Sequence, residues 1–218
     1  MHAQYFFRKQ WLLTLFCLLI SFSSWAATNP LILVVGDSLS AEYGLARGTG
    51  WVGYLESKLK SDGSPWYAFN ASISGETTSG GLARLPRLLE QKNPGMVMIE
   101  LGANDALRGL PIADTERNLR QMIQMSKKIG AKVVLFGMQI PPNYGQTYTT
   151  NFKTMYVSLA KEENIPLLPF FLEGIATKPE FFQADRIHPN EAAQKKLFEN
   201  VWGTLAPYRD YLKSAPRQ

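Results

Sequence analysis

Short runs of consecutive apolar residues recur along the chain, separated by segments in which apolar and polar positions repeat with helical spacing. The runs do not alternate between apolar and polar residues, and this continuity is typical of strands that are buried on both faces. We therefore predict a set of short interior strands. They are Leu31–Val35, Trp66–Phe69, Met96–Leu101, Val133–Met138 and Leu167–Phe170.

Helical spacing is clearest from Phe152 to Ala160, where apolar residues recur at i, i+3, i+4, i+7 and i+8 before Pro166 ends the pattern. The segment Leu82–Gln91 predicts a weaker helix, because Pro86 is expected to kink or delay it. The other predicted helices are Trp51–Leu59, Leu119–Ile129 and Asn190–Leu205.

Alternation of strands and helices predicts the α/β class, with a five-stranded parallel sheet covered by helices on both faces in a three-layer, flavodoxin-like arrangement. The chain has 218 residues, enough for one domain with a sizeable core, and neither an internal repeat nor a low-complexity linker divides it. Ligands of such sheets bind at the carboxyl ends of the strands. Functional side chains are therefore expected where the predicted strands end.

The first 26 residues have the pattern of a secretory signal peptide. Arg8 and Lys9 precede an uncharged apolar run that is too short to span a bilayer comfortably, and small residues up to Ala26 form a cleavage site. A retained membrane anchor is the alternative, but no second basic flank follows the run. Cleavage predicts export to the periplasm or the medium without a stable membrane anchor, leaving a domain at residues 27–213 and a frayed tail at 214–218.

Cleavage would simplify the available chemistry. The only cysteine, Cys17, and one of the two histidines, His2, lie in the leader, so His188 is the single imidazole of the mature chain. Cysteine nucleophiles and thiolate metal sites are then excluded, and one histidine among scattered carboxylates predicts no metal or other cofactor. The net charge falls from +5 to +3 when Arg8 and Lys9 leave, and without a basic run it predicts a solvated surface rather than a nucleic-acid partner.

The first predicted strand ends in Gly36-Asp37-Ser38, within the stretch LILVVGDSLS. At the carboxyl end of a strand, this turn would project Ser38 into the crevice rather than into the core. An ordinary βα turn is the alternative, because Gly, Asp and Ser favour turns for local reasons. The five-residue nucleophile elbow Gly-x-Ser-x-Gly is absent, since its last position is Ser40.

A serine hydroxyl is a poor nucleophile unless a neighbouring base removes its proton. His188 lies in the motif Asp185-Arg186-Ile187-His188-Pro189, whose spacing lets the Asp185 carboxylate turn back to accept one ring N–H and leaves the other ring nitrogen for Ser38. A capping Asp beside a surface His is the alternative for a single motif of this kind. It is disfavoured because no other imidazole is available in the mature chain.

Acyl-bond hydrolysis also requires donors for an oxyanion. Asn104 follows the third predicted strand and offers a side-chain amide, and Gly75 follows the second and can present its backbone N–H closely. Both also have ordinary explanations, because Asn and Gly commonly end strands and form turns. Asp37 and Asp105 beside these residues are expected to make turn hydrogen bonds rather than to act as further acids.

Four blocks of the sequence resemble those of the GDSL, or SGNH, hydrolases. They follow the order of that family, cover nearly the whole mature chain, and identify residues 27–213 as an SGNH hydrolase domain. The blocks read GDSLS at 36–40, SGET around Gly75, GAND at 102–105 and DRIHP at 185–189.

The resemblance implies a residue-by-residue assignment of catalytic roles. Ser38 would be the nucleophile, His188 its base and Asp185 the partner of the base. The oxyanion hole would consist of the backbone N–H groups of Ser38 and Gly75 with the Asn104 side chain. These roles imply two-step acyl transfer through an acyl-enzyme, without a metal or organic cofactor.

Within the family, the chain is most similar to exported thioesterase, lysophospholipase and arylesterase enzymes. This likeness implies a serine esterase for carboxylic ester and thioester bonds of small acyl substrates, expected as a monomer. Leu107, Leu110 and Tyr144 are predicted to line a groove for the acyl chain, or alternatively only to cover the sheet edge. The blocks that carry the likeness are residues 71–89, 101–110, 141–148 and 166–171.

Two other functions remain open from the residues alone. A non-catalytic, flavodoxin-like binding module could place a cofactor phosphate against the loop after the first strand, because helix N-termini attract anions. That reading leaves Asn104 and the Asp185-x-x-His188 motif unexplained. A carbohydrate acetylesterase of the same family would use the same catalytic residues, but apolar loops disfavour a sugar substrate.

Overall fold

The computed structural model describes residues 30–215. The predicted signal peptide at 1–26 therefore lies outside the described residues, as do residues 216–218 of the predicted tail. Ser214, the first residue of that tail, is held in place, because its carbonyl accepts a hydrogen bond from Trp66 Nε1 at 2.9 Å.

The predicted parallel sheet is confirmed. Its five strands have the order β2-β1-β3-β4-β5, and every neighbouring pair is parallel. Ligands of sheets with this order bind where the strand order reverses, which here is between β1 and β3. The strands are β1 (Leu31–Gly36), β2 (Tyr67–Asn70), β3 (Met96–Glu100), β4 (Lys132–Phe136) and β5 (Leu167–Leu168).

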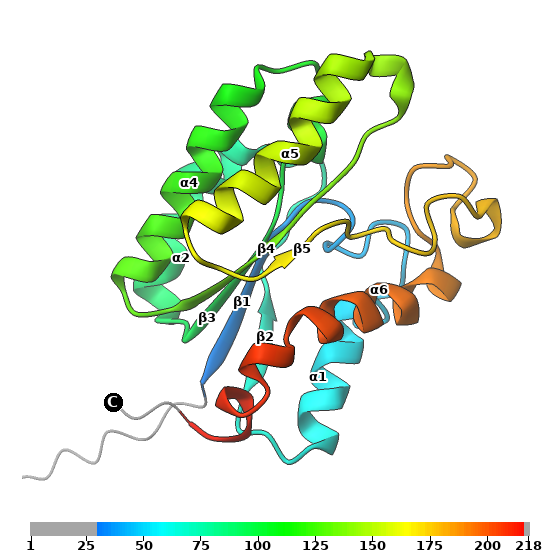
Figure 1. Cartoon of the computed structure of the whole chain (residues 1–218). Helices are drawn as coiled ribbons and strands as arrows, with labels where there is room; N and C mark the ends of the chain where they lie inside the picture. The colour runs from blue at the N-terminus through cyan, green and yellow to red at the C-terminus, as the bar shows by residue number, and fades with distance from the viewer. Residues whose placement is uncertain (1–29, 216–218) are drawn as a thin grey trace, which may run out of the picture.

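Helices cover both faces of the sheet, so the predicted three layers are also confirmed (Figure 1). On one face α1 packs against α6, and on the other α4 packs against both α2 and α5. The helices are α1 (Trp51–Ser61), α2 (Thr78–Lys92), α3 (Ala103–Leu107), α4 (Ile112–Lys128), α5 (Gln146–Glu162) and α6 (Glu191–Thr204).

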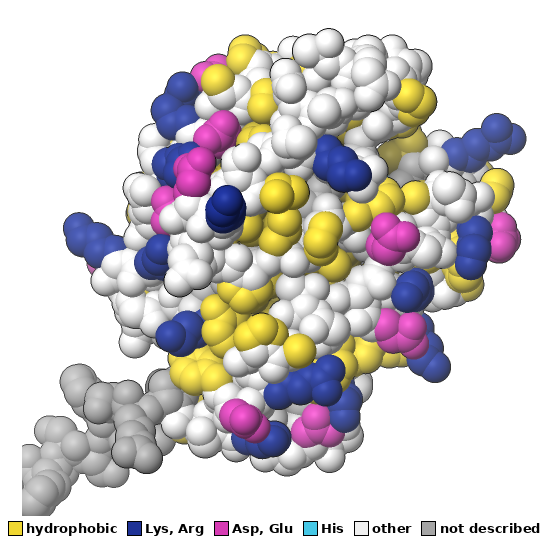
Figure 2. All heavy atoms as spheres, viewed as in Figure 1, with side chains coloured by type: hydrophobic (Ala, Val, Ile, Leu, Met, Phe, Trp, Pro, Cys, Tyr) yellow, Lys and Arg dark blue, Asp and Glu magenta, His cyan; other side chains and the backbone are white. Residues whose placement is uncertain are grey.

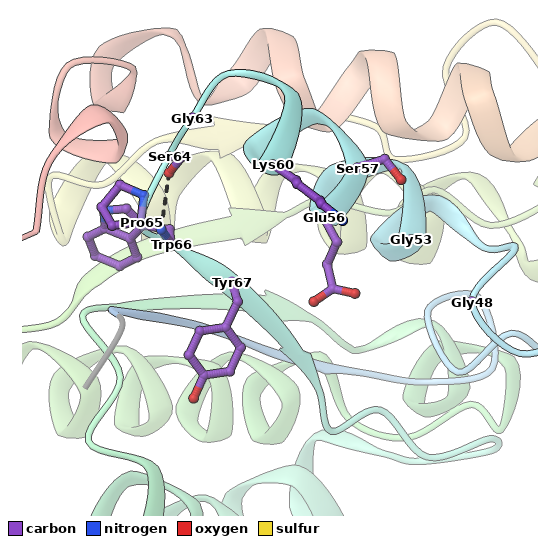
Figure 3. Close-up of a pocket in the computed structure, with 10 residues that line it drawn as sticks. All are labelled: Gly48, Gly53, Glu56, Ser57, Lys60, Gly63, Ser64, Pro65, Trp66 and Tyr67. Atoms are coloured by element: carbon purple, nitrogen blue, oxygen red, sulfur yellow. Dashed lines mark hydrogen bonds between the residues drawn. The ribbon is translucent and has the colours of Figure 1, made fainter. Parts of the chain in front are cut away.

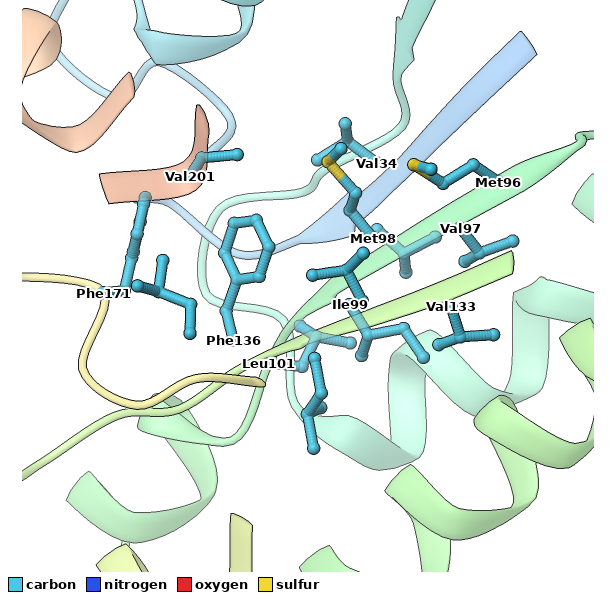
Figure 4. Packing of buried hydrophobic residues seen from close by; sticks show 14 of the residues in the cluster. Val34, Met96, Val97, Met98, Ile99, Leu101, Val133, Phe136, Phe171 and Val201 are labelled. Atoms are coloured by element: carbon cyan, nitrogen blue, oxygen red, sulfur yellow. The ribbon is translucent and has the colours of Figure 1, made fainter. Parts of the chain in front are cut away.

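The core lies between these layers and is built on the central strands. Every residue of β1 and of β3 is buried, which explains why their sequences are continuously apolar rather than alternating. Figure 4 shows Phe136 at the end of β4 close to Phe171, and the centroids of the two rings are 5.3 Å apart. Trp51 at the start of α1 packs on both rings, at 5.6 and 5.8 Å. This aromatic cluster packs the start of α1 against the end of β4.

The prediction that Pro86 would delay the second helix is wrong. α2 begins at Thr78, before the expected start at Leu82, and includes Pro86 in its interior. Its early start follows from capping, since Thr77 accepts a hydrogen bond from the Gly80 N–H and Asp105 accepts one from the Thr78 N–H. Pro86 lies on the exposed side of the helix, where the carbonyl that loses its partner can be hydrated.

Two other helical segments differ from their predictions. α4 begins at Ile112 rather than at Leu119. The sequence pattern missed its first turns because they contain mostly polar residues, which do not show the helical spacing of apolar positions. Thr115 continues the buried side of the helix one turn before Leu119. The short helix α3 was not among the predicted helices, and it carries Asn104 just after β3.

Candidate active site

The turn after β1 places Ser38 at the carboxyl edge of the sheet. The Asp37 carbonyl closes the turn by accepting the Ala41 N–H at 2.8 Å. Gly36 is required here by close approach, since a Cβ atom at this position would lie 2.7 Å from the carboxylate of Glu100 and 2.9 Å from Ser40. Gly36 therefore leaves room for a buried glutamate behind the turn, while the Ser38 side chain extends to His188.

A loop before α6 brings His188 to Ser38. Phe182 and Pro189 pair as an antiparallel bridge, and the Gln183 N–H donates to the His188 carbonyl at 2.8 Å. His188 Nε2 lies 2.9 Å from Ser38 Oγ, although the two residues are far apart in the sequence. The structure thus brings together the serine and the imidazole that the sequence proposed.

Asp185 holds the other side of the imidazole. One of its carboxylate oxygens is 2.7 Å from His188 Nδ1, and the other accepts the backbone N–H groups of Ile187 at 2.9 Å and His188 at 3.0 Å. These hydrogen bonds, first that of the His188 backbone, then that of its ring and that of Ile187, lower the pKa of Asp185 to about 2. An ionised Asp185 favours the tautomer in which Nδ1 carries the proton and Nε2 faces Ser38 as an acceptor.

Tyr43 contacts the imidazole face and was not singled out in the sequence. Its ring centroid is 4.3 Å from that of His188, with 37° between the planes. Gln183 Nε2 donates to the Tyr43 carbonyl at 2.8 Å and ties the nucleophile loop to the histidine loop. A tyrosine shortly after the Gly-Asp-Ser turn was the available signal, but its contact with a distant histidine depends on the tertiary fold.

Two candidate backbone donors, the N–H groups of Ser38 and Gly75, lie in the turns that follow β1 and β2. Gly75 has φ 77°, a left-handed conformation that glycine adopts without strain, and its carbonyl accepts a hydrogen bond from Arg108 at 2.9 Å. Within residues 30–215, neither the Ser38 N–H nor the Gly75 N–H donates to a protein acceptor. Both groups are therefore available to a developing oxyanion.

Asn104 extends from α3 toward the nucleophile turn. Its Nδ2 atom is 3.1 Å from a carboxylate oxygen of Asp37 and 3.1 Å from the carbonyl of Glu76. Both amide hydrogens are thus engaged, so donation to an oxyanion requires the amide to share or release one of them. Gly102 before α3 has φ 117°, and a Cβ there would lie 2.2 Å from the Tyr156 hydroxyl.

The expectation that Asp37 and Asp105 make turn hydrogen bonds is correct only in part. Asp37 accepts the Leu39 N–H at 3.0 Å within its own turn, but its second oxygen binds Asn104. Asp105 instead accepts the Thr78 N–H at 2.9 Å and caps α2, far along the chain. Both carboxyl groups are buried, and their hydrogen bonds hold parts of the fold in place.

The residues predicted to line an acyl groove lie on two linked segments, one at the end of α3 and the other after β4. Leu107, Leu110 and Tyr144 all have exposed side chains. The Tyr144 hydroxyl donates to the Leu107 carbonyl at 3.3 Å, and the Tyr148 hydroxyl donates to the Leu110 carbonyl at 2.7 Å. The tyrosines therefore join the segment that runs from β4 into the first turn of α5 to the end of α3 and the residues after it. Tyr148 was missed in the sequence.

A surface pocket of about 590 Å³ lies elsewhere, between α1 and the start of β2 (Figure 3). Glu56, Lys60 and Trp66 line it, together with Tyr67, which pairs with Leu31 at the first residue of β1. The pocket thus reaches the amino-terminal edge of the sheet, opposite to Ser38. None of the residues of the Ser38 site lines this pocket. The Ser38 site is recognised instead by its hydrogen bonds.

A hydroxyl, an imidazole and an ionised carboxylate are joined by hydrogen bonds beside free N–H donors. This arrangement at the carboxyl edge of a parallel sheet defines a serine hydrolase. The model of the GDSL-like Lipase/Acylhydrolase family matches residues 34–196, and the chain belongs to that family.

Known proteins of similar sequence and structure are esterases and thioesterases. The chain is 48% identical over 191 residues to esterase TesA of Pseudomonas aeruginosa, and the aligned region covers 88% of this chain and 95% of that protein. It is 46% identical over 193 residues to thioesterase 1/protease 1/lysophospholipase L1 of Escherichia coli, covering 88% and 90%. A crystal structure of the psychrotrophic esterase EstA from Pseudoalteromonas sp., inhibited by monoethylphosphonate, matches with a TM-score of 0.79 at 40% identity, covering 83% of this chain and 98% of that one.

These comparisons confirm the enzyme class predicted from the sequence. The protein is a serine esterase of the GDSL hydrolases. The non-catalytic, flavodoxin-like binding module is wrong, although the strand order of that fold is correct.

Proposed function

We propose that Ser38 is the nucleophile of this esterase, with His188 as its base and Asp185 as the partner of the base. The observation that carries the proposal is the continuous chain of hydrogen bonds from Ser38 Oγ through both ring nitrogens of His188 to Asp185. A neutral imidazole whose Nδ1–H is held by a carboxylate can accept the serine proton at Nε2.

The reaction then proceeds in two steps. Ser38 Oγ attacks the carbonyl carbon while its proton moves to His188 Nε2, and the carbonyl oxygen becomes an oxyanion near the N–H groups of Ser38 and Gly75. His188 passes the proton to the leaving oxygen or sulfur as the acyl bond breaks. Water repeats the attack on the acyl-enzyme, with His188 again as base, and regenerates Ser38.

Asn104 is proposed as the third oxyanion donor. Asn104→Ala is expected to lower kcat roughly 10²–10³-fold with little change in KM, because the oxyanion is present only in the transition state. Steady-state kinetics with an aryl ester measures both constants. Asn118→Ala is a matched control, since that amide is also half-buried but donates to Thr78 at 3.0 Å. An effect of Asn104→Ala on KM alone would contradict the proposed role.

The proposed substrates are small acyl esters and thioesters, including aryl esters and lysophospholipids. Exposed apolar residues near the nucleophile turn support this class. Ile73, whose N–H donates to the Gly36 carbonyl, and Ile187, which precedes His188, are 51% and 56% exposed. A carbohydrate acetylesterase would instead need polar groups for sugar hydroxyls. Hydrolysis rates for aryl esters, acyl-thioesters, lysophospholipids and acetylated oligosaccharides, compared on the mature chain, would rank these substrates.

Leu107, Leu110 and Tyr144 are proposed to contact the acyl chain. The double variant Leu107→Ser/Leu110→Ser is expected to lower kcat/KM for long-chain esters about tenfold while sparing acetyl esters, because lost apolar contact is worth about 1–3 kcal/mol. A chain-length series of aryl esters measures the difference. Val157→Ser is a matched control, since Val157 is an exposed apolar residue on α5, outside the proposed groove. Equal losses for short and long chains would exclude the groove.

We further propose an exported, monomeric enzyme that acts in the periplasm and binds no nucleic acid. The leader pattern supports export. On the face shown in Figure 2, Lys and Arg side chains are interspersed with Asp and Glu, which supports a solvated surface. From residue 30 to residue 215, none of the helices combines the length and the apolar character that crossing a membrane requires. Fractionation of cells and size-exclusion chromatography of the mature chain test location and oligomeric state.

A further inference from the structure

The helix that carries Asn104 is too short to be stable by itself. α3 has five residues, and its N-cap is Gly102, which has no side chain to accept a hydrogen bond from the first turn. Isolated helices shorter than about 12–15 residues are marginal in water, so contacts with the rest of the fold must hold this one. The position of the Asn104 amide therefore depends on what α3 is attached to.

Asp105, the next residue of α3, joins this helix to the start of α2. Asp105 is 2% exposed, and Thr78, the first residue of α2, is 0% exposed. One carboxylate oxygen accepts the Thr78 N–H at 2.9 Å, and the other accepts the Thr78 hydroxyl at 2.5 Å. Hydrogen bonds to a carboxylate are short and strong, and a negative charge is also favoured at the N-terminus of a helix such as α2. The two helices are therefore joined firmly at this point.

The same two segments of the chain also meet at Asn104. Its Nδ2 atom donates to the Glu76 carbonyl at 3.1 Å, and Glu76 lies two residues before Thr78. Consecutive residues of α3 thus bind to one short segment that continues from Gly75. Because Asn104 and Asp105 are neighbours in a helix, a shift of α3 that breaks the contact of Asp105 also moves the Asn104 amide.

The segment around Gly75 has further anchors, which do not involve α3. The Ile73 N–H donates to the Gly36 carbonyl at 3.0 Å, at the end of β1. The Glu76 N–H donates to the Ile73 carbonyl at 3.2 Å and closes the turn that contains Gly75. Loss of a contact at α3 is therefore expected to displace Asn104 more than Gly75.

We propose that Asp105 is a positioning residue, which holds the Asn104 amide in place through its two hydrogen bonds to Thr78 and takes no direct part in the reaction. The expected effect on turnover rests on the role proposed above for Asn104 as an oxyanion donor. The expected effect on the position of the amide does not rest on that role.

Hydrogen exchange measured by nuclear magnetic resonance on the mature protein tests the position of the amide without reference to catalysis. The side-chain N–H pair of Asn104 is assigned as the pair that is missing from Asn104→Ala. Thr78→Val removes the hydroxyl and keeps the shape, and it is expected to make this pair exchange faster with water, whereas Thr78→Ser is expected to leave its rate near the parental value. The Gln194 pair, which donates to the Asn190 carbonyl at 3.1 Å on α6, is the reference for general loosening. An unchanged rate for Asn104, or equal acceleration of both pairs, would overturn the proposal.

Steady-state kinetics with an aryl ester tests whether this position matters for turnover. Thr78→Val is expected to lower kcat about 10-fold to 100-fold with KM nearly unchanged, because a misplacement of about 1 Å can cost that much. Thr78→Ser is expected to restore most of kcat. In an Asn104→Ala background, Thr78→Val should cause little further loss, because both changes act through one group. The full loss in that background would refute the action through Asn104, whereas an Asn104→Ala variant with parental kcat would refute the role of Asn104 itself.

Asn118→Ala is the matched control within the same set of hydrogen bonds. It removes the amide that donates to the Thr78 hydroxyl at 3.0 Å, and it leaves both bonds to Asp105 in place. Near-parental kcat is expected, and a loss as large as that of Thr78→Val would contradict the role of Asp105. If Thr78→Val does not fold by circular dichroism, Asp105→Asn replaces it, since an amide of the same shape keeps only one acceptor oxygen. The same loss of kcat, and the same dependence on Asn104, are then expected.

Discussion

Ser38→Ala is expected to lower kcat roughly 10⁴–10⁶-fold while leaving the fold intact, because removal of a triad nucleophile leaves only binding and oxyanion stabilisation. The side chain is half-buried at a turn, and its Oγ atom makes one hydrogen bond, to His188 Nε2. Its loss therefore removes chemistry without opening the core. Turnover of an aryl ester and a thioester, with circular dichroism as the check on folding, measures this outcome.

The same residue is expected to be the site of covalent modification. A phosphonate or sulfonyl fluoride reagent should label one hydroxyl per chain, and peptide mass spectrometry should place the label on Ser38. Ser74→Ala is the matched control, since Ser74 is an exposed serine beside Gly75 with no contact to His188. A label on another residue, with Ser38→Ala still active, would remove the serine from the mechanism.

The sequence was sufficient to predict those contacts of the site that form between residues close together in the chain. Asp185 and His188 lie three residues apart, and their contact forms within one short loop. The strands were also predictable, because strands buried on both faces give continuous apolar runs. Strand ends then placed Ser38 and Asn104 at the same edge of the sheet, on either side of the position where the strand order reverses.

Contacts between distant segments were not predictable in this way. The early start of α2 depends on Asp105, which reaches Thr78 only in the folded chain. Glu100 reads in the sequence as the polar end of a strand, yet it is buried because Gly36 leaves space for it. Ser40 occupies the position of a glycine in the common nucleophile elbow, and its hydroxyl donates a hydrogen bond to that glutamate.

Asp185→Asn is expected to lower kcat about 10⁴-fold with the fold retained, because an amide can hold the imidazole in the wrong tautomer. The pKa of Asp185 is depressed to about 2, so its ionised form favours the folded site above the ordinary value of 3.8, and this contribution is lost as the pH falls from there through about 2. A fall in activity that begins above about pH 4 as the pH is lowered is therefore not caused by protonation of Asp185. A pH series of kcat/KM on both proteins measures this. Asp210→Asn, at an exposed ion pair with Lys213, is the control, and near-parental turnover of Asp185→Asn throughout the series would exclude Asp185 from the site.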